Sequence, residues 1–490
     1  MTVTSPTEAF PAPGPGGWRR LADHFPRALT AEYQCLYAST CPPGMASYME
    51  RYGVVARTLD VAVVRGHLYI TPVPLAGPRE SRRSPPRALV WMLSRLHPAF
   101  RRRTRAARAA LAARPWRAVT DHWFTVERDE WRRRNTEVEN VDPAGLDATR
   151  LADHLRACHR LVTSGYLRHF ELHGDDLLPV GLLIARCQEW GVDPALASGS
   201  LAGASRAPHA SEVSGWMLVT GYDLDCLTWN ELGDTAGVAV PGHPHPVDLR
   251  QHVRAEHHAE LAVLVADACR AAELRDDNGA ITGAWPMGLL RRAMLAAGDL
   301  LCPADPTLAV EATVDELVSL LTGAGGLTRV ELDRRRRQRL ADSALDAPPA
   351  IGPELAIPPL DALPRPLALI GAAQLAAADH MLGDGHPVGI GTDCYTGRAL
   401  VVDDPTVAMD AFEPGDVVVT AATSPSWNTV LAHAGALVTA TGGLVSHAAI
   451  TARELGIPAV IGDPTACRRL RTGATVTVDP INATVVTLGD

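Results

Sequence analysis

The most informative stretch of the chain, ALVTATGGLVSHAAITARELGIPAVIG, runs from residue 436 to residue 462. An apolar segment is followed by Gly442 and Gly443, and Ser446 stands directly before a run of helix-forming residues. Serine is a favoured N-cap residue, because its hydroxyl can accept a hydrogen bond from a free N–H of the first turn. The pattern predicts a strand, a glycine turn and a helix that begins beside His447.

A histidine at a helix N-terminus has altered chemistry. The positive end of the helix dipole disfavours the protonated ring, which lowers the pKa and leaves a nucleophilic nitrogen at neutral pH. If a phosphoryl group is attached to His447, the same helix end and the amides of Gly442 and Gly443, beside the Ser446 cap, can stabilise its charge. Arg453, six residues into the helix, is either a further phosphate contact or a surface cation. The alternative for His447 itself is a capping or core histidine.

Residues 441–462 resemble the phosphohistidine segment of the phosphoenolpyruvate synthase and pyruvate phosphate dikinase family. The resemblance extends from about Gly389 to Leu488 and includes PGDVVVTAATSPSW upstream and GATVTVD downstream. It implies that His447 carries phosphate. It also implies that the C-terminal domain is a mobile, swivelling carrier that moves between two active sites.

The composition removes several mechanisms. The chain has 490 residues, 46 basic and 55 acidic side chains and a net charge of −9, and every basic residue is arginine. Without lysine there is no Schiff base, no lysine general base and no phosphate-loop lysine. The acidic balance argues against a nucleic-acid partner. Two arginine runs, Arg101–Arg103 with Arg105 and Arg108 and Arg334–Arg337 with Arg339, are expected to be solvated helix faces rather than phosphate sites.

The pattern predicts a multidomain α+β protein. We expect a disordered arm at 1–17 and a mainly helical substrate-binding domain at 18–346, which includes a β-hairpin near 54–73. A proline-rich linker is expected at 347–366, and an α/β phosphohistidine domain at 367–490.

Nothing in the sequence indicates secretion or a membrane span. Nine scattered cysteines without CxxC spacing fit a reduced cytoplasm. The N-terminus lacks the pattern of a signal peptide, and no uncharged apolar run reaches about 18 residues. We therefore expect a cytoplasmic protein without a membrane partner.

The helical region lacks the strand-rich pattern of an ATP-grasp domain, and no phosphoenolpyruvate-binding barrel follows the carrier segment. We therefore expect that this chain binds neither ATP nor a metal directly. ATP and Mg²⁺ are expected on a separately encoded ATP-grasp protein, which would phosphorylate His447.

The order of a helical domain before a phosphohistidine domain is similar to that of the rifamycin phosphotransferases, whose helical domain binds the antibiotic. The segments TGYDLDCLTWNEL and LRDDNGAITGAWPMGLLRRAMLAAGDLL support this resemblance. It makes Arg275 a candidate substrate-binding residue. His257 or His258 could act as base on a substrate hydroxyl, and Arg291 could meet a phosphorylated group; exposed positions are the alternative for all three.

His169 and His173 are one helical turn apart, which invites a metal site. The zincin pattern, however, requires glutamate directly after the first histidine, and phenylalanine stands there. We therefore expect helix packing rather than metal binding.

These observations predict a phosphotransferase component that carries a phosphoryl group on His447 to a hydroxyl of a small hydrophobic molecule, in antibiotic or natural-product metabolism. Two alternatives stay open. One is a dehydratase or condensing enzyme that activates its substrate by ATP-dependent phosphorylation, and the other is a binding protein with a relic carrier domain.

Overall fold

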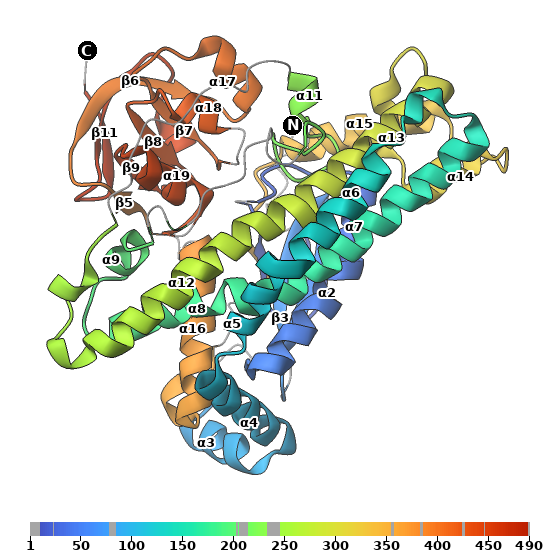
Figure 1. The fold of residues 1–490 in the computed structure, drawn as a ribbon. Coiled ribbons are helices and arrows are strands. Elements are labelled where there is room, and N and C mark those ends of the chain that lie inside the picture. Colours follow the sequence, from blue (N-terminus) through green and yellow to red (C-terminus); the bar gives the residue numbers. More distant parts are fainter. Residues whose placement is uncertain are drawn as a thin grey trace.

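The computed structural model describes residues 10–22, 24–77, 85–201, 204, 214–232, 246–353, 357–382, 386–423, 427–444 and 446–488. A large helical part lies against a smaller α/β part formed by the C-terminal residues (Figure 1). The chain is thus a mixed helix and sheet protein, as the sequence predicted.

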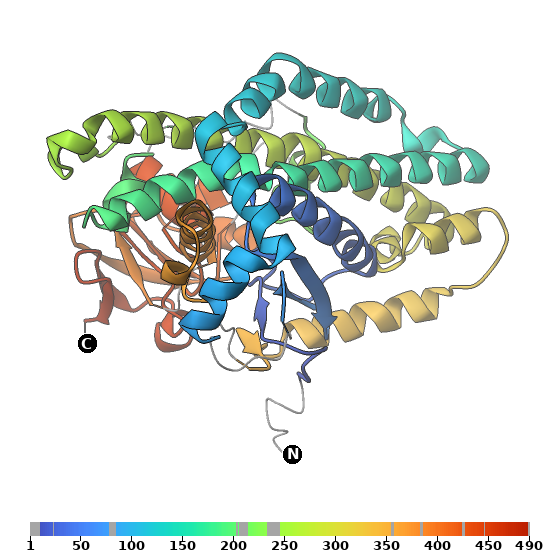
Figure 2. The same ribbon diagram turned by 90° about the horizontal axis from the view of Figure 1, so that it is seen from below.

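The helical part contains long helices that lie alongside one another, with the N-terminal strands on one side of them (Figure 2). Its helices are α2 (Ala31–Tyr52), α3 (Arg87–Leu96), α4 (Pro98–Ala113), α5 (Trp116–His122), α6 (Arg128–Glu139), α7 (Ala148–Asp176), α8 (Leu178–Glu189), α9 (Pro194–Gly199), α11 (Trp229–Leu232), α12 (His258–Asn278), α13 (Trp285–Leu301), α14 (Val314–Leu321), α15 (Arg329–Ser343) and α16 (Arg365–Leu382). A π-helical turn, Gly279–Ala284, joins α12 to α13.

Helix α7 shows why this part folds as a bundle. Leu151, Leu155, Cys158 and Val162 recur every three or four residues and are buried in the main apolar core. Such spacing places them on one face of the helix, which packs against α2 and α13. Helix α2 comes so close to α7 that a Cβ at Gly44 would lie 2.5 Å from Cβ of Phe170. Only glycine therefore fits at this crossing.

A four-stranded antiparallel sheet covers one side of the bundle. The predicted hairpin is confirmed as β2 (Ala56–Val64) and β3 (His67–Pro74), joined through Gly66 at a φ of 74°. The strands β1 (Trp18–Arg20) and β4 (Ala350–Ile351) extend it in the order β2-β3-β1-β4.

The expected disordered arm is partly packed. Residues 1–9 lie outside the described residues, but Phe10 is only 3% exposed and packs in a small cluster with Trp18. The indole nitrogen of Trp18 donates to the Gly14 carbonyl at 3.2 Å. The arm was expected to be disordered because it is rich in proline and glycine, yet Phe10 packs into an apolar cluster formed by other segments of the chain.

The described parts of the expected linker are also packed. Besides forming β4, this segment has Ala362 and Leu363 buried in the helical core. Helix α16, which begins near the expected start of the C-terminal domain, packs against α8 and α4. A Cβ at Gly181 of α8 would lie 2.1 Å from the Ala373 carbonyl of α16. Helix α16 thus belongs with the helical part, and the first strand of the α/β part begins at Val388.

The α/β part is a seven-stranded sheet of order β11-β10-β6-β7-β8-β9-β5. Strands β6, β7, β8 and β9 are parallel, and the other three pair antiparallel. The strand predicted before Gly442 and Gly443 is present as β8. The bounds are β5 (Val388–Ile390), β6 (Tyr395–Val401), β7 (Val417–Thr420), β8 (Ala436–Thr439), β9 (Ala459–Ile461), β10 (Thr475–Asp479) and β11 (Thr484–Thr487).

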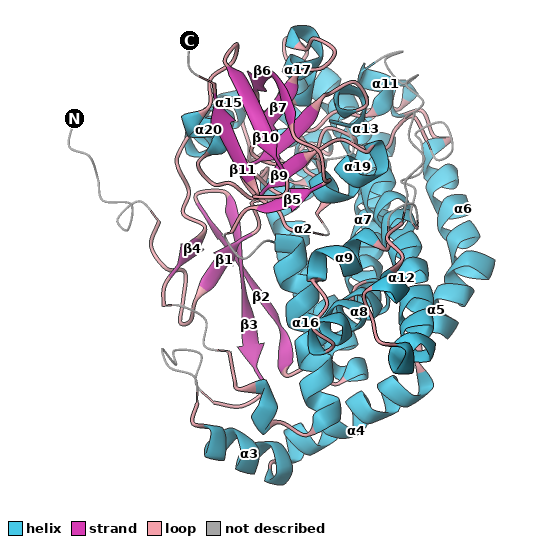
Figure 3. Ribbon diagram, turned by 90° about the vertical axis from the view of Figure 1, so that its left-hand side faces the viewer, coloured by secondary structure: helices cyan, strands magenta, loops and turns pink. Residues whose placement is uncertain are grey.

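Separate apolar clusters cover the two faces of this sheet. One face packs on α17 (Pro405–Ala411), α18 (Asn428–Leu431) and α19 (His447–Leu455), and the other on α20 (Ala466–Arg469) and the curled strands β10 and β11. Figure 3 shows this part at the opposite end of the molecule from α3 and α4. Within the described residues, none of the helices combines the length and apolarity that a bilayer crossing requires.

Candidate active site

Helix α19 begins at His447, directly after the glycine turn that follows β8. Ser446 is the N-cap, and its hydroxyl accepts from the Ala449 N–H at 3.3 Å. Gly442 has a φ of 108°, and a Cβ there would lie 2.9 Å from the Ser446 hydroxyl oxygen. The Ser446 N–H in turn donates to the Gly443 carbonyl at 3.0 Å. The predicted turn, cap and helix start are therefore all present.

Both ring nitrogens of His447 face a threonine hydroxyl. Nδ1 lies 2.8 Å from Oγ1 of Thr423, and Nε2 lies 3.4 Å from Oγ1 of Thr451, one turn further along the helix. The tautomer that carries its proton on Nδ1 can donate to Thr423 and leaves a lone pair on Nε2. This is the arrangement that a nucleophilic imidazole requires.

Thr423 was not among the residues predicted from the sequence. It follows β7, and β7 is the parallel neighbour of β8, the strand that leads to His447. The carboxyl ends of adjacent parallel strands meet at one edge of a sheet, so loops that follow them lie together. Polar residues directly after adjacent parallel strands were therefore a usable signal.

His447 is half-buried and uncharged at neutral pH. Burial, and then the positive charge of Arg275, together lower the pKa of His447 from 6.5 to about 4. Arg275 belongs to the last turn of α12, in the helical part. The structure thus brings together two predicted site residues that are 172 positions apart in the sequence.

Arg453 forms a hydrogen bond with the loop that precedes His447. Its Nη1 donates to the Leu444 carbonyl at 2.6 Å, while Nη2 is buried and has no hydrogen-bond partner among the described residues. Burial lowers the pKa of Arg453 to about 10. The side chain therefore remains a cation at neutral pH, with one donor that a phosphoryl group could use.

The site lies at the junction of the two parts. The Ser198 hydroxyl of α9 donates to the Leu444 carbonyl at 2.8 Å, in a buried hydrogen bond. Burial, and then the negative charge of Asp276, raise the pKa of Glu454 to about 7, whereas Arg275 opposes this rise. The first and last turns of α19 thus both lie close to the end of α12.

A row of polar side chains continues from Arg275 into the bundle. Asn278, one turn further along α12, lies 3.0 Å from Nδ1 of His169, and the rings of His169 and His173 are 4.7 Å apart. Nδ1 of His173 lies 3.5 Å from the carboxylate of Asp176, which is fully buried and without a hydrogen-bond partner among the described residues. Burial lowers the pKa of His169 well below its usual value.

The other predicted substrate residues are elsewhere. His257 and His258 lie at the start of α12, about 25 Å along the helix from Arg275 at 1.5 Å per residue. The His257 ring stacks on Trp190, and Nε2 of His258 lies 2.9 Å from a backbone carbonyl. Both are therefore remote from His447.

Arg291 is buried, not exposed. Its guanidinium forms an ion pair with Glu231 at 2.7 Å and donates to the Leu224 carbonyl at 2.5 Å. These contacts tie α13 to the segment that contains α11. The charge of Arg291 is thus already neutralised within the bundle, which leaves Arg275 as the predicted substrate residue that lies beside His447.

Residues 412–482 match the family model of the PEP-utilising enzyme mobile domain. YvkC of Bacillus subtilis, an uncharacterized phosphotransferase, is 42% identical over 117 residues, which cover 22% of this chain and 14% of the relative. Phosphoenolpyruvate synthase of Aquifex aeolicus is 46% identical over 91 residues, covering 19% of this chain and 10% of the relative.

A rifampicin phosphotransferase of Streptomyces sviceus is 45% identical over 94 residues, which are 19% of this chain and 10% of that protein. The chain therefore spans only about a tenth to a seventh of the length of these relatives. The likeness to the mobile domain of PEP-utilising enzymes, inferred from the sequence around His447, is confirmed for the C-terminal part.

Proposed function

We propose that this protein is the acceptor-side component of a phosphotransferase. His447 takes a phosphoryl group from a donor and passes it to a hydroxyl of a small molecule held by the helical part. The observation that carries this proposal is the position of His447: a neutral imidazole at a helix N-terminus, close enough to Arg275 of the helical part for that cation to lower its pKa.

The two transfers balance as simple displacements. In the first, the Nε2 lone pair of His447 attacks phosphorus, an N–P bond forms and the P–O bond to the donor breaks. In the second, the oxygen of the acceptor hydroxyl attacks phosphorus, the N–P bond breaks and the hydroxyl proton leaves. Thr423 holds Nδ1 in both steps, while the start of α19 and Arg275 stabilise the charge of the phosphoryl oxygens.

The helical part supplies the acceptor side. Arg275 and Asn278 lie one turn apart on α12, and Asn278 contacts His169. We infer that the acceptor hydroxyl binds along this row. The neutral imidazole of His169 can then receive the proton of that hydroxyl. We infer that His257, His258 and Arg291 take no part, because their side chains contact Trp190, the Val253 carbonyl and Glu231, respectively.

The donor side is assigned to a second protein. ATP and Mg²⁺ would be bound by a separate ATP-grasp chain, as expected from a sequence that has no lysine to hold nucleotide phosphates. Parallel strands in this chain are confined to the α/β part, as far as the structure describes it.

The test is a labelling experiment. The purified chain is incubated with γ-labelled ATP, alone and together with an ATP-grasp protein encoded beside its gene, and label on His447 is located by mass spectrometry. We expect acid-labile label only with both proteins present, and none on a His447→Gln variant. Labelling by ATP alone would disprove the two-protein arrangement, and label that survives in the variant would disprove the role of His447.

The mass of the final product separates the two enzymatic classes. A phosphate ester of the acceptor supports the kinase-like transfer proposed above. A product that has lost water supports a dehydratase, in which the same His447 chemistry only activates the hydroxyl.

A further inference from the structure

Helix α3 exposes the residues that a helix normally buries. Leu89, Trp91, Met92 and Leu96 are 39%, 54%, 43% and 68% exposed, and only Val90 and Ser94 of this helix are buried. Scattered exposed apolar residues are common, but Leu89, Met92 and Leu96 are spaced by three and four residues and so share one face of this ten-residue helix, which forms an apolar patch. The patch is therefore a candidate contact surface.

The neighbouring helix α4 adds unpaired positive charge. Residues 87–114 contain eight arginines and no acidic residue. Arg101, Arg105 and Arg108 lie on the exposed stripe of α4, and none of them forms an ion pair with the residues that the structure describes. Arg95 of α3 lies over the Trp91 ring at 4.5 Å. The helix that directly follows and contacts the apolar helix α3 thus carries three exposed cations that have no ion pair among the described residues.

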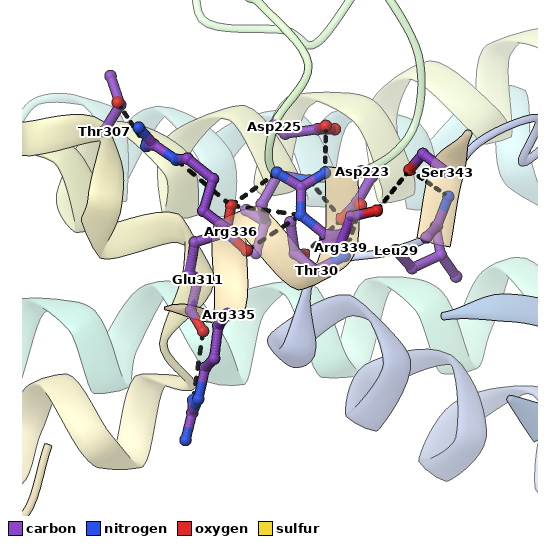
Figure 4. Close-up of polar contacts among 12 residues, drawn as sticks. Leu29, Thr30, Asp223, Asp225, Thr307, Glu311, Arg335, Arg336, Arg339 and Ser343 are labelled. Carbon is purple, nitrogen blue, oxygen red and sulfur yellow. Dashed lines mark hydrogen bonds and ion pairs between the residues drawn. The ribbon is translucent and has the colours of Figure 1, made fainter. Parts of the chain in front are cut away.

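The arginines of the second run, on α15, all form ion pairs, in contrast to Arg101, Arg105 and Arg108 of the first run. On α15, Arg335 pairs with Glu316 at 2.7 Å and Arg336 with Asp305 at 2.8 Å. Arg339 pairs with Glu311 at 2.6 Å (Figure 4). That run is neutralised by the bundle and holds it together. Both runs were expected to be solvated faces, but among the described residues only the α4 run includes exposed arginines without an ion pair, namely Arg101, Arg105 and Arg108.

The surface formed by Leu89, Trp91, Met92, Leu96, Arg101, Arg105 and Arg108, here called the basic-apolar surface, is remote from His447. Figures 1 and 3 show α3 and α4 at one end of the molecule and the α/β part at the other. A partner bound to this surface would leave the active site unobstructed.

We propose that the basic-apolar surface binds peripherally to an anionic lipid bilayer. Tryptophan and leucine beside arginine are the side chains with which interfacial helices enter the headgroup region. A second copy of the chain is disfavoured, because the two surfaces would bring like charges together. An acidic protein would need a fitted pocket for each projecting side chain, whereas lipid adapts to their arrangement.

This proposal differs from the expectation of no membrane partner. That expectation rested on the lack of a spanning segment, which says nothing about a helix that lies in the plane of the interface. The overall charge of −9 does not oppose it either, because at physiological salt an exposed charge acts over only about 8 Å. The local cations therefore decide the interaction.

Co-sedimentation of the full chain with vesicles tests the proposal. The vesicles contain either phosphatidylcholine alone or equal parts of phosphatidylcholine and phosphatidylglycerol, at 50 and 300 mM NaCl. We expect binding to the anionic vesicles and weaker binding at high salt. A triple variant with Arg101, Arg105 and Arg108 changed to glutamine should bind about 100-fold more weakly, at roughly fivefold per arginine.

The apolar contribution has its own variants and control. Trp91→Ala with Leu96→Ala should weaken vesicle binding at least about tenfold. In the wild type, brominated lipid should quench a part of the tryptophan fluorescence that Trp91→Phe removes. The matched control is Arg334→Gln with Arg337→Gln on α15, where both arginines are ion-paired, and it should bind as the wild type.

Three results would overturn the proposal. The first is the absence of binding to anionic vesicles at 50 mM salt, which would favour an acidic protein as the partner. The second is binding that the Trp91 and Leu96 changes leave unaltered, which indicates adsorption by charge alone. The third is equal loss in the α15 control. Circular dichroism and thermal melts confirm that each variant is folded.

Discussion

Replacing Arg275 with glutamine removes a charge of the helical part that acts on His447 of the α/β part. The pKa of His447 falls from 6.5 to about 4, with burial as the larger cause and Arg275 as the second. At about 1.4 kcal/mol per pKa unit, this fall corresponds to roughly 3 kcal/mol against the charged ring. Arg275 accounts for less than half of it, so we expect the pKa of His447 in the variant to lie about one unit higher and still below 6.5.

The measurement needs neither substrate nor partner. The ring C–H signals of histidine-labelled protein are followed by NMR as the pH falls from 8, and His447→Gln identifies the signal of interest. Arg270→Gln is the matched control, because Arg270 lies on the same helix but contacts Phe124 and Glu273. It should leave the titration of His447 unchanged.

The direction of the pH effect is also determined. A histidine whose pKa is lowered by folding does not affect stability above pH 6.5, where the ring is neutral in both states. Below that pH the unfolded chain binds the proton and the folded chain does not, so stability falls progressively towards pH 4. If His447 titrates near 6.5 in the wild type, or if the Arg275 and Arg270 variants shift it equally, the electrostatic effect of Arg275 on His447 does not exist in solution.

Three further predictions concern the stability of the fold. Glu454→Gln should stabilise the protein by about 1–3 kcal/mol at pH 8 and not at pH 4. The pKa of Glu454 is raised to about 7, so the ionised carboxylate destabilises the folded state only as the pH rises above 4.5; equal melting shifts at both pH values would contradict this. Gly442→Ala should cost about 1–3 kcal/mol in urea unfolding, because residue 442 has a φ of 108°; an unchanged midpoint would show that the turn is not strained. Arg339→Met should cost about 3–5 kcal/mol, because it leaves the buried carboxylate of Glu311 without its partner at 2.6 Å; a cost below about 1 kcal/mol in the same assay would argue against the network in Figure 4.

Local regularities were readable from the sequence because short-range physics decides them. The apolar segment before Gly442 located β8 (Ala436–Thr439), and the N-cap Ser446 with the glycine turn located the start of α19. Each of these depends on hydrogen bonds and backbone angles within a few residues. The resemblance around His447 rests on the same local segment.

The packing of low-complexity segments was harder to predict. Proline-rich residues 347–366 contain little regular structure, which is typical of a linker, but Ala350 and Ile351 complete the N-terminal sheet as β4. Phe10 likewise finds a place in a cluster with Trp18. Whether such a segment binds depends on an apolar surface or a free strand edge elsewhere in the chain, which no local pattern contains.

The sequence by itself determined the local composition of the candidate site: a histidine at a helix start, a glycine turn before it, and no lysine anywhere in the chain. Only the tertiary structure decided which residues serve it. Arg275 and Thr423 lie beside His447, whereas His257 and His258 lie at the far end of α12 and Arg291 is occupied by Glu231. The physical reason is that a helix separates its residues by 1.5 Å each along its axis, so His258 and Arg275 of the same helix are far apart. Residues of distant segments, such as Arg275 and His447, come together where their elements pack.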